Sequence, residues 1–187
     1  AKRAKAHELS GPWQAAAGLV SVPSYVTGPD QTFTPYDVEE LNDNQVNPIA
    51  VLQGKMRIYG ARSVSADREN WLLITGADTM NRIITAAETK LEDYVFGTID
   101  GKGVLLKGIE GALEGIVKPM SDVGGLFPQY NEDMEMVDPG FKIATTQLNE
   151  PLELATNTVY CVLSVRVSPT AELIRLNITK ASVTAQL

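Results

Sequence analysis

The sequence contains one histidine and one cysteine, the residue types on which most nucleophilic arrangements depend. His7 is the only histidine, so any Ser/His/Asp or Cys/His arrangement for nucleophilic catalysis would depend on it. Cys161 falls on the apolar side of a segment that alternates like a strand, where a cysteine is typically a small buried hydrophobe. We therefore predict no catalytic residue and no enzymatic activity.

Two further stretches contain residues that could hold an ion. Glu132, Asp133 and Glu135 offer oxygen ligands for a hard cation, but they lack the spacing of a calcium loop and are typical of a solvated loop. The DGKG stretch, 100–103, precedes a helical pattern and could cradle a phosphate, yet the full glycine-rich fingerprints are absent. A helix-capping turn is the favoured interpretation, and we expect neither a metal nor a cofactor.

Aromatic and amide residues add no stronger signal. Trp13 and Trp71 lack basic neighbours in the sequence, so packing is favoured over stacking on bases or sugars. The triplet 177–179 (Asn-Ile-Thr) matches a glycosylation acceptor, but it lies in a predicted strand and we take it as a chance match.

Composition indicates a folded, acidic chain. Its 187 residues are 44% hydrophobic, enough for one substantial core, and 23 acidic against 16 basic residues give a net charge of −7. We therefore expect neither nucleic acid nor an anionic membrane as a partner, on electrostatic grounds. No apolar run approaches the roughly 20 residues of a membrane span, and the start AKRAKAHELSGPW lacks the apolar middle of a signal peptide. Because the chain starts at Ala1, we expect a fragment or a processed product of something longer.

The first half predicts a short helix and a hairpin. Thr34 as N-cap, Pro35 at the first helical position and Asp37 three residues after the cap predict a helix ending near Asn42. Alternating apolar residues on either side of a Gln-Gly-Lys turn, 53–55, predict a strand pair. Residues 1–33 mix helix formers with breakers, and we expect them to be irregular and on the surface.

Two longer amphipathic helices follow. The first is predicted from Asp78, as N-cap, to Val95, and the second over 105–120, with Pro119 marking its end. A second stripe runs beside the apolar face of the later helix, formed by Gly108, Gly111 and Gly115. Each glycine costs about 1 kcal/mol against alanine in a helix. Either another backbone packs closely there or the helix is partly frayed, and the sequence leaves both open.

The last part of the chain predicts a loop over 122–140, a strand from Phe141 and a longer strand over 159–167. After Pro169, residues 174–178 carry one apolar face, and we expect them to complete the chain's own sheet. The apolar residues then change to the opposite face, occupied by Ala181, Val183 and Ala185. A one-residue slip moves every side chain across a sheet, so a bulge or a change of strand partner is predicted at 179–181.

These elements predict an α+β fold, with a mixed or antiparallel sheet flanked by two main helices and with extended N- and C-terminal arms. We divide the chain into a linker or a truncated remainder of an upstream domain (1–33), a main domain (34–179) and a C-terminal arm (180–187).

The order of several short motifs resembles the C-terminal domain of contractile tail sheath proteins, which occur in contractile-tailed bacteriophages and phage-tail-like particles. The motifs cover most of the chain, from about Gly11 to residue 179. They are GPWQAAAG at 11–18, Leu41-Asn42, Asn47-Pro48-Ile49, Gly60-Ala61-Arg62, Trp71, Val95-Phe96, and Pro169, Ala171 and Glu172. Two departures stand out. The family's paired arginines are replaced by TGADT at 75–79, and an expected glycine is replaced near Asn157, where asparagine can supply the same left-handed turn.

The resemblance implies a non-enzymatic structural subunit that forms stacked hexameric rings around a tail tube and contracts to drive the tube through a cell envelope. It implies, as partners, other copies of the chain, the tube protein, the baseplate and the tail terminator, without nucleic acid or membrane insertion. It places the protein in a virion tail or phage-tail-like particle assembled in the bacterial host cytoplasm. Extended arms would add strands to neighbouring subunits, and we assign that role to the face formed by Ala181, Val183 and Ala185.

Two other functional classes remain open. One is a stand-alone α/β binding or adhesion module that pairs an edge strand with an unrelated partner. The other is a hydrolase of unfamiliar type, which would have to rely on His7.

Overall fold

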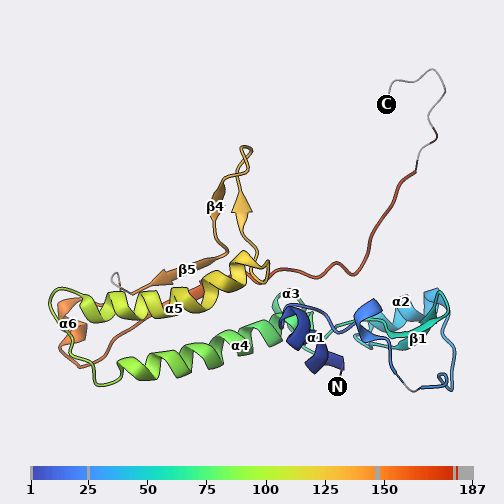
Figure 1. Ribbon diagram of the computed structural model, residues 1–187, viewed down its shortest axis with the longest axis horizontal. Helices are drawn as coiled ribbons and strands as arrows, with labels where there is room; N and C mark the ends of the chain where they lie inside the picture. The colour runs from blue at the N-terminus through green and yellow to red at the C-terminus, as the bar shows by residue number, and fades with distance from the viewer. Residues whose placement is uncertain (1, 25, 146–147, 179, 181–187) are drawn as a thin grey trace.

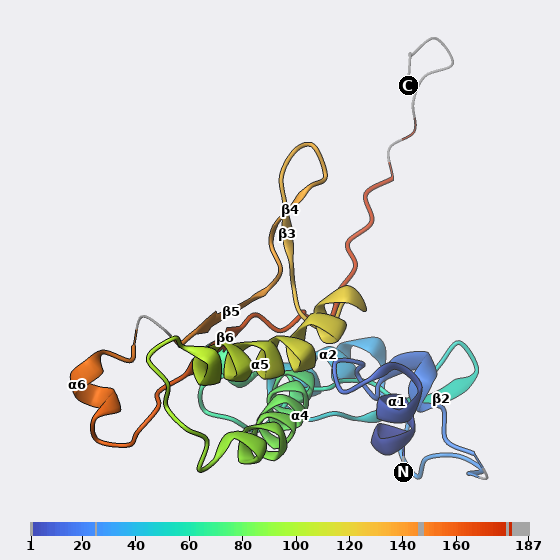
Figure 2. The ribbon, with the colours of Figure 1, turned by 60° about the vertical axis from the view of Figure 1, so that its left-hand side comes forward.

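The computed structural model describes residues 2–24, 26–145, 148–178 and 180 (Figure 1). Two long helices lie side by side and form most of the body, a hairpin projects from it, and the C-terminal segment leaves it as an extended arm (Figures 1 and 2). The helical elements are α1 (Lys2–Ser10), η1 (Gly18–Ser21), α2 (Pro35–Asp43), α3 (Arg68–Trp71), α4 (Ile74–Leu91), η2 (Glu92–Tyr94), α5 (Val104–Asp122) and α6 (Pro151–Leu154).

The strands form three separate two-stranded antiparallel sheets within the described part of the chain. The pairs are β1 (Ile49–Leu52) with β2 (Lys55–Ile58), β3 (Gln129–Tyr130) with β4 (Met136–Asp138), and β5 (Phe141–Ala144) with β6 (Val162–Val165). The predicted α+β class with two main helices is confirmed, and the strands are distributed over three small sheets.

Local signals set α2 and the first hairpin as predicted. The Thr34 hydroxyl accepts from the Asp37 backbone N–H at 3.2 Å, and the Asp37 carboxylate accepts from the Thr34 N–H at 2.7 Å, which closes a capping box. Between β1 and β2, Gln53 and Gly54 have φ of 52° and 70°. Two left-handed residues form the tight turn whose twist matches an antiparallel pair.

The N-terminal segment is more ordered than the sequence predicted. Residues 2–10 form α1, and Ala6, Ala15 and Ser21 are buried. The Ser21 hydroxyl donates to the carbonyl of Ile58 at 3.2 Å, and the Ile58 N–H donates back to it at 3.0 Å. This segment therefore packs against the β1–β2 hairpin, and the expectation of an irregular surface stretch was wrong.

The N-cap of the first main helix lies five residues earlier than predicted, at Leu73. α4 starts at Ile74, whose N–H donates to the carbonyl of Ala61 at 2.8 Å. That contact satisfies one of the free N–H groups of the first turn, so no side-chain cap is needed. Asp78 lies inside the helix and is buried, which corrects its predicted role as N-cap.

The second main helix continues through its proline. α5 runs to Asp122 with Pro119 inside it, and the carbonyl of Pro119 accepts from the N–H of Val123 at 3.3 Å. A proline removes only one backbone bond near a helix end, so Pro119 does not mark the end as predicted. The glycine stripe is helical throughout. A Cβ on Gly108 would come within 2.8 Å of the Tyr94 ring, so a side chain packs closely there.

The core lies where α4, α5 and the β5–β6 sheet meet. Ile83, Val117, Met120 and Leu126 are buried, and each contributes about 1.5–3 kcal/mol relative to an exposed side chain. Several partly buried side chains complete this core, namely Trp13, Ile116, Phe141, Leu163, Val165 and Val167. The predicted packing role of Trp13 is confirmed.

The predicted loop over 122–140 contains a projecting hairpin, formed by β3 and β4 (Figure 2). Its turn is held by the Asn131 carbonyl oxygen Oδ1, which accepts from the Glu135 N–H at 2.8 Å, and Met134 adopts φ of 62°. The loop prediction was therefore wrong for 129–138. Each strand is too short and too exposed to give an alternating pattern.

The final stretch differs most from expectation. β6 covers only 162–165 of the predicted strand over 159–167, although the alternation of inward and outward residues holds. Residues 169–178 form no strand, and Ile174, Leu176 and Ile178 are 85%, 79% and 81% exposed. The prediction that 174–178 complete the chain's own sheet was wrong. The predicted break at 179–181 and the face formed by Ala181, Val183 and Ala185 lie outside the described residues, except for position 180.

Candidate functional site at the root of the C-terminal arm

The side chain of Asn47 acts as a strand partner for the backbone of Arg62. Its amide Nδ2 donates to the Arg62 carbonyl at 2.8 Å, and its Oδ1 accepts from the Arg62 N–H, also at 2.8 Å. Asn47 sits between the end of α2 and the start of β1, and Arg62 follows β2. Two paired hydrogen bonds therefore fix the position of the Arg62 main chain against the preceding loop.

Gly60 permits this approach. Its φ is +138°, and a Cβ built on it would lie 2.3 Å from Oδ1 of Asn42 and 2.5 Å from Oδ1 of Asn47. Only glycine combines that backbone conformation with such close neighbours. The Gly-Ala-Arg motif therefore has a steric reason for its first residue.

The guanidinium of Arg62 contacts oxygen atoms of three residues. Nη1 donates to the Asn42 carbonyl at 2.7 Å and to the Asp43 carboxylate at 3.1 Å. Nε donates to both carboxylate oxygens of Glu172, at 3.3 and 3.1 Å, and Nη2 lies 3.0 Å from Oε2. The Arg62 side chain is only 19% exposed. The Glu172 carboxylate raises the pKa of Arg62, with Asp43 contributing. Nε and Nη2 therefore face one carboxylate, and a hydrogen bond between ionised groups is stronger than one between neutral groups.

We call these residues the arm-root cluster, because Glu172 lies where the chain leaves the body; the extended segment that begins at residue 173 is called the arm from here on. Its members are Asn42, Asp43, Asn47, Gly60, Arg62 and Glu172. A hollow of about 540 Å³ adjoins the cluster, between α2 and the first residues of the arm, and Val38, Tyr59, Ala171 and Leu173 are among its lining residues.

The other predicted motif residues lie around this cluster. Pro48 accepts from the Tyr59 N–H at 2.8 Å, Ile49 begins β1, and the buried Ala61 receives the start of α4. Trp71 ends α3 at 38% exposure, with its carbonyl accepting from the Ser63 hydroxyl, and Pro169 lies just before the arm. The structure thus brings Asn47, Gly60, Arg62 and Glu172 together. Trp71 lies outside this group, at the end of α3.

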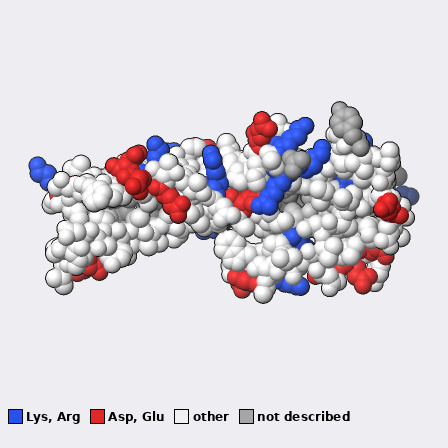
Figure 3. All heavy atoms as spheres, turned by 90° about the horizontal axis from the view of Figure 1, so that it is seen from below, with Lys and Arg blue, Asp and Glu red and all other residues white. Residues whose placement is uncertain are grey.

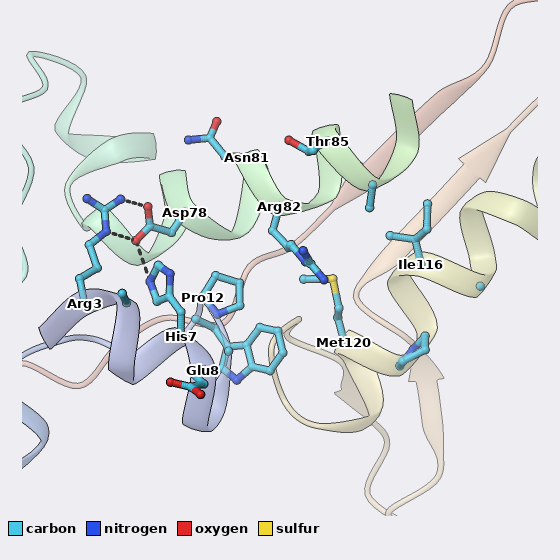
Figure 4. Close-up of a pocket in the computed structure, with 16 residues that line it drawn as sticks. Arg3, His7, Glu8, Pro12, Asp78, Asn81, Arg82, Thr85, Ile116 and Met120 are labelled. Atoms are coloured by element: carbon cyan, nitrogen blue, oxygen red, sulfur yellow. Dashed lines mark hydrogen bonds and ion pairs between the residues drawn. The ribbon is translucent and has the colours of Figure 1, made fainter. Parts of the chain in front are cut away.

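A second polar cluster joins the N-terminal helix to α4 (Figure 4). Arg3 Nε donates to the Asp78 carboxylate at 2.6 Å, and His7 Nε2 lies 3.0 Å from the same carboxylate, whose side chain is 6% exposed. Burial and, secondarily, the Arg3 charge lower the pKa of His7. Sequence reasoning missed this pair, although Arg3 and His7, four residues apart in a segment of helix formers, necessarily share a helix face.

The groove beside this cluster has a volume of about 1140 Å³ and lies between α1, α4 and α5. Figure 4 shows Asp78 pointing toward α1 and, further along α4, Arg82 pointing toward Met120 of α5. Since Arg3 and His7 of α1 both contact one buried carboxylate, the cluster anchors α1 to α4. His7, the residue on which any nucleophilic arrangement would depend, is used here in a structural contact.

The remaining candidate residues have local roles. The Asp100 carboxylate accepts from the N–H groups of Val104 and Leu105, both at 3.1 Å, which confirms the predicted capping turn before α5. Asn157 has φ of 58°, as predicted for the position of the missing glycine. Cys161 is partly buried and unpaired among the described residues.

The described part of the chain contains neither a metal-binding cluster nor a membrane-spanning helix. Glu132, Asp133 and Glu135 lie at the tip of the β3–β4 hairpin. The described residues hold no group of three or more His, Cys, Asp or Glu side chains placed to bind a metal ion. None of the described helices has the length and apolar character needed to cross a bilayer. Acidic and basic side chains occur together over the face drawn in Figure 3.

The fold is that found in the sheaths of contractile injection systems, and this confirms, at the level of the fold, the resemblance drawn from the motifs. A chain of the anti-feeding prophage (AFP) helical sheath in the contracted state superposes with a TM-score of 0.78 at 18% identity, covering 95% of this chain and 48% of that chain. A chain of the PVC sheath complex of an extracellular contractile injection system, also contracted, gives 0.77 at 16% identity and covers 96% and 49%.

A chain of the AFP baseplate, 6-fold symmetrised, gives a TM-score of 0.79 at 18% identity, with 97% of this chain and 48% of that chain covered. The chain thus spans about half the length of these solved chains. No family model matches the sequence, and no curated protein does either.

Proposed function

We propose that this chain is part of a sheath subunit of a contractile tail or phage-tail-like particle, which polymerises as hexameric rings around a tail tube and contracts to drive the tube through the target envelope. The observation that carries the proposal is the superposition of 95–97% of the chain on chains from contracted sheath and baseplate assemblies. The subunit is structural and non-enzymatic, and it works by rearranging contacts between subunits.

The exposed arm supports self-association. Leu173 and Ile174 are 67% and 85% exposed, and Leu176 and Ile178 continue the apolar series. An extended backbone with unpaired N–H and C=O groups and alternating apolar residues is suited to adding a strand to another sheet. Each such side chain contributes about 1.5–3 kcal/mol when a partner buries it.

The β3–β4 hairpin is a candidate receiving edge. It projects from the body on the same side as the arm in both views, and Tyr130, Met136 and Val137 are about half exposed or more (Figures 1 and 2). A two-stranded hairpin leaves both outer edges able to accept a strand. We propose that the arm of one copy pairs with a sheet edge of another. Residues 181–187, including Ala181, Val183 and Ala185, would extend that pairing.

The remaining partners follow from the sheath assignment. They are the tail tube protein, the baseplate and the tail terminator, with no nucleic acid and no membrane insertion. The location is the tail of a virion or of a phage-tail-like particle, assembled in the bacterial host cytoplasm. The second candidate is a stand-alone binding or adhesion module, and the observation that favours it is the same exposed arm, which could pair with an unrelated partner.

Negative-stain microscopy of the full-length gene product distinguishes the sheath subunit from the stand-alone module. A sheath subunit forms striated or cross-hatched tubes. A product that stays monomeric at high concentration would contradict the proposal and favour the stand-alone module.

A matched pair of arm variants tests the pairing itself. Leu176→Asp places a charge on the apolar face and is expected to abolish tubes, whereas Asn177→Asp adds the same charge on the opposite face and is expected to retain them. Tubes of normal length from Leu176→Asp would show that this face is not buried between subunits.

A further inference from the structure

Residues 167–172 make the last contacts between the chain and the body before the arm begins. Val167 pairs with Leu126 as an isolated bridge, and the hydroxyls of Thr170 and Thr75 lie 3.4 Å apart. Glu172 then meets Arg62, and from Leu173 onward the large apolar side chains are mostly exposed. The Arg62–Glu172 ion pair is therefore the last strong contact before the arm.

We propose that Arg62 is a positioning residue that clasps the arm at Glu172 and so fixes the point and direction from which residues 173–178 leave the body. The effect of this contact on assembly rests on the proposed function. The statement that Arg62 fixes the arm does not depend on it.

Arg62 is suited to this role because its own position is set before it meets the arm. Asn47 holds its backbone, and Asn42 and Asp43 hold one end of its guanidinium. A fork that is already oriented loses little rotamer entropy when it binds a further carboxylate. The free side of the fork, Nε and Nη2, faces Glu172.

Loss of the clasp would move the last fixed point back to Thr170. Each released residue lengthens the flexible segment by up to about 3.3–3.6 Å. Releasing residues 171 and 172 would therefore enlarge the volume that Leu173 and Ile174 sample. The effective concentration of the arm's apolar residues at a neighbouring subunit's sheet edge falls as the volume that the arm samples grows. Breaking the clasp should therefore leave the body folded and weaken any contact made by the arm.

The experiment measures the distance distribution between two spin labels, one on α4 and one on the arm, in this chain. The labelled chain carries Glu88→Cys and Ile174→Cys, with Cys161→Ser to remove the native thiol. Glu172→Gln breaks the ion pair at nearly constant volume, and Glu39→Gln, which removes a negative charge from nearby α2, is the matched control. Arg62→Lys keeps the charge but loses the fork.

We expect Glu172→Gln to broaden the distribution, Arg62→Lys to broaden it less, and Glu39→Gln to leave it unchanged. Equal widths for Glu172→Gln and the parent chain, with circular dichroism unchanged, would overturn the proposal.

Sheath assembly of the full-length subunit gives the second readout. Glu172→Gln should raise the concentration needed for tube formation by about 3-fold to 10-fold, the effect of one partly buried charge-assisted contact. A broadened arm with unchanged assembly would refute the role of the clasp in assembly. Failure of the unmodified subunit to form tubes would count against the proposed function, while the label distances would still decide whether Arg62 fixes the arm.

Discussion

Arg62 and Glu172 form an ion pair across 110 residues of sequence, with Nη2 and Oε2 3.0 Å apart. One residue belongs to the Gly-Ala-Arg segment after β2, and the other to the segment that begins the C-terminal arm. Their meeting brings two short motifs that lie far apart in the sequence into direct contact. It also means that the stability of the loop around Asn47 and the order of the arm are physically connected.

Asn47→Ala should lower the free energy of unfolding by about 2 kcal/mol, because it leaves the N–H and C=O of Arg62 without their partners in a partly buried site. Asn44→Ala is the matched control. Its side chain makes one exposed bond to the Glu40 carbonyl, so its loss should cost about 0.5 kcal/mol. Urea unfolding of both variants measures the difference, and equal midpoints would contradict the pairing role of Asn47.

Gly60→Ala should destabilise the fold by about 2 kcal/mol or more, because its Cβ would overlap two amide oxygens at a φ that alanine rarely adopts. Gly76→Ala serves as control, since this glycine lies in α4 with open space around its Cβ position. Alanine there should raise stability by up to about 1 kcal/mol. Thermal melts of the two variants should therefore shift in opposite directions, and a shared direction would refute the steric argument.

Asp78→Asn should loosen α1. The neutral amide keeps the shape of the side chain but loses the charge that Arg3 meets, at a cost of about 2 kcal/mol. Amide hydrogen exchange in residues 2–10 should accelerate, while exchange in the centre of α5 should not. Asp133→Asn at the hairpin tip removes the same charge and should change neither region. Protection of α1 at the parental level would show that the cluster does not hold it.

Low pH should remove the contribution of the ionised Asp100 carboxylate to folding stability. Hydrogen bonds from the N–H groups of Val104 and Leu105 lower the pKa of this carboxyl below its ordinary value. The unfolded chain thus takes up the proton first as pH falls, so the stabilisation is present above the unfolded pKa and is lost as pH falls through the folded pKa. At pH 7, Asp100→Asn should be less stable than the parent, and the difference should narrow below about pH 4. A constant difference down to pH 2 would contradict this.

The structure could be predicted where the signal is local. The capping box of Thr34 and Asp37, the Gln53-Gly54 turn and the left-handed Asn157 each depend on groups within a few residues, and all three occur as expected. The bodies of α4 and α5 follow from apolar periodicity, because one face of each helix must be buried whatever it packs against.

Tertiary contacts decided the rest. The start of α4 depends on the carbonyl of Ala61, the fixation of α1 depends on Asp78, and the β3–β4 hairpin has no buried face to mark it in the sequence. Residues 174–178 alternate like a strand, but alternation does not state which sheet the strand joins. By itself the sequence determined the elements and their apolar faces, because those depend on near neighbours. Only the folded chain decided that Arg62 meets Glu172 and that the arm leaves the body, because partners 110 residues apart are set by packing.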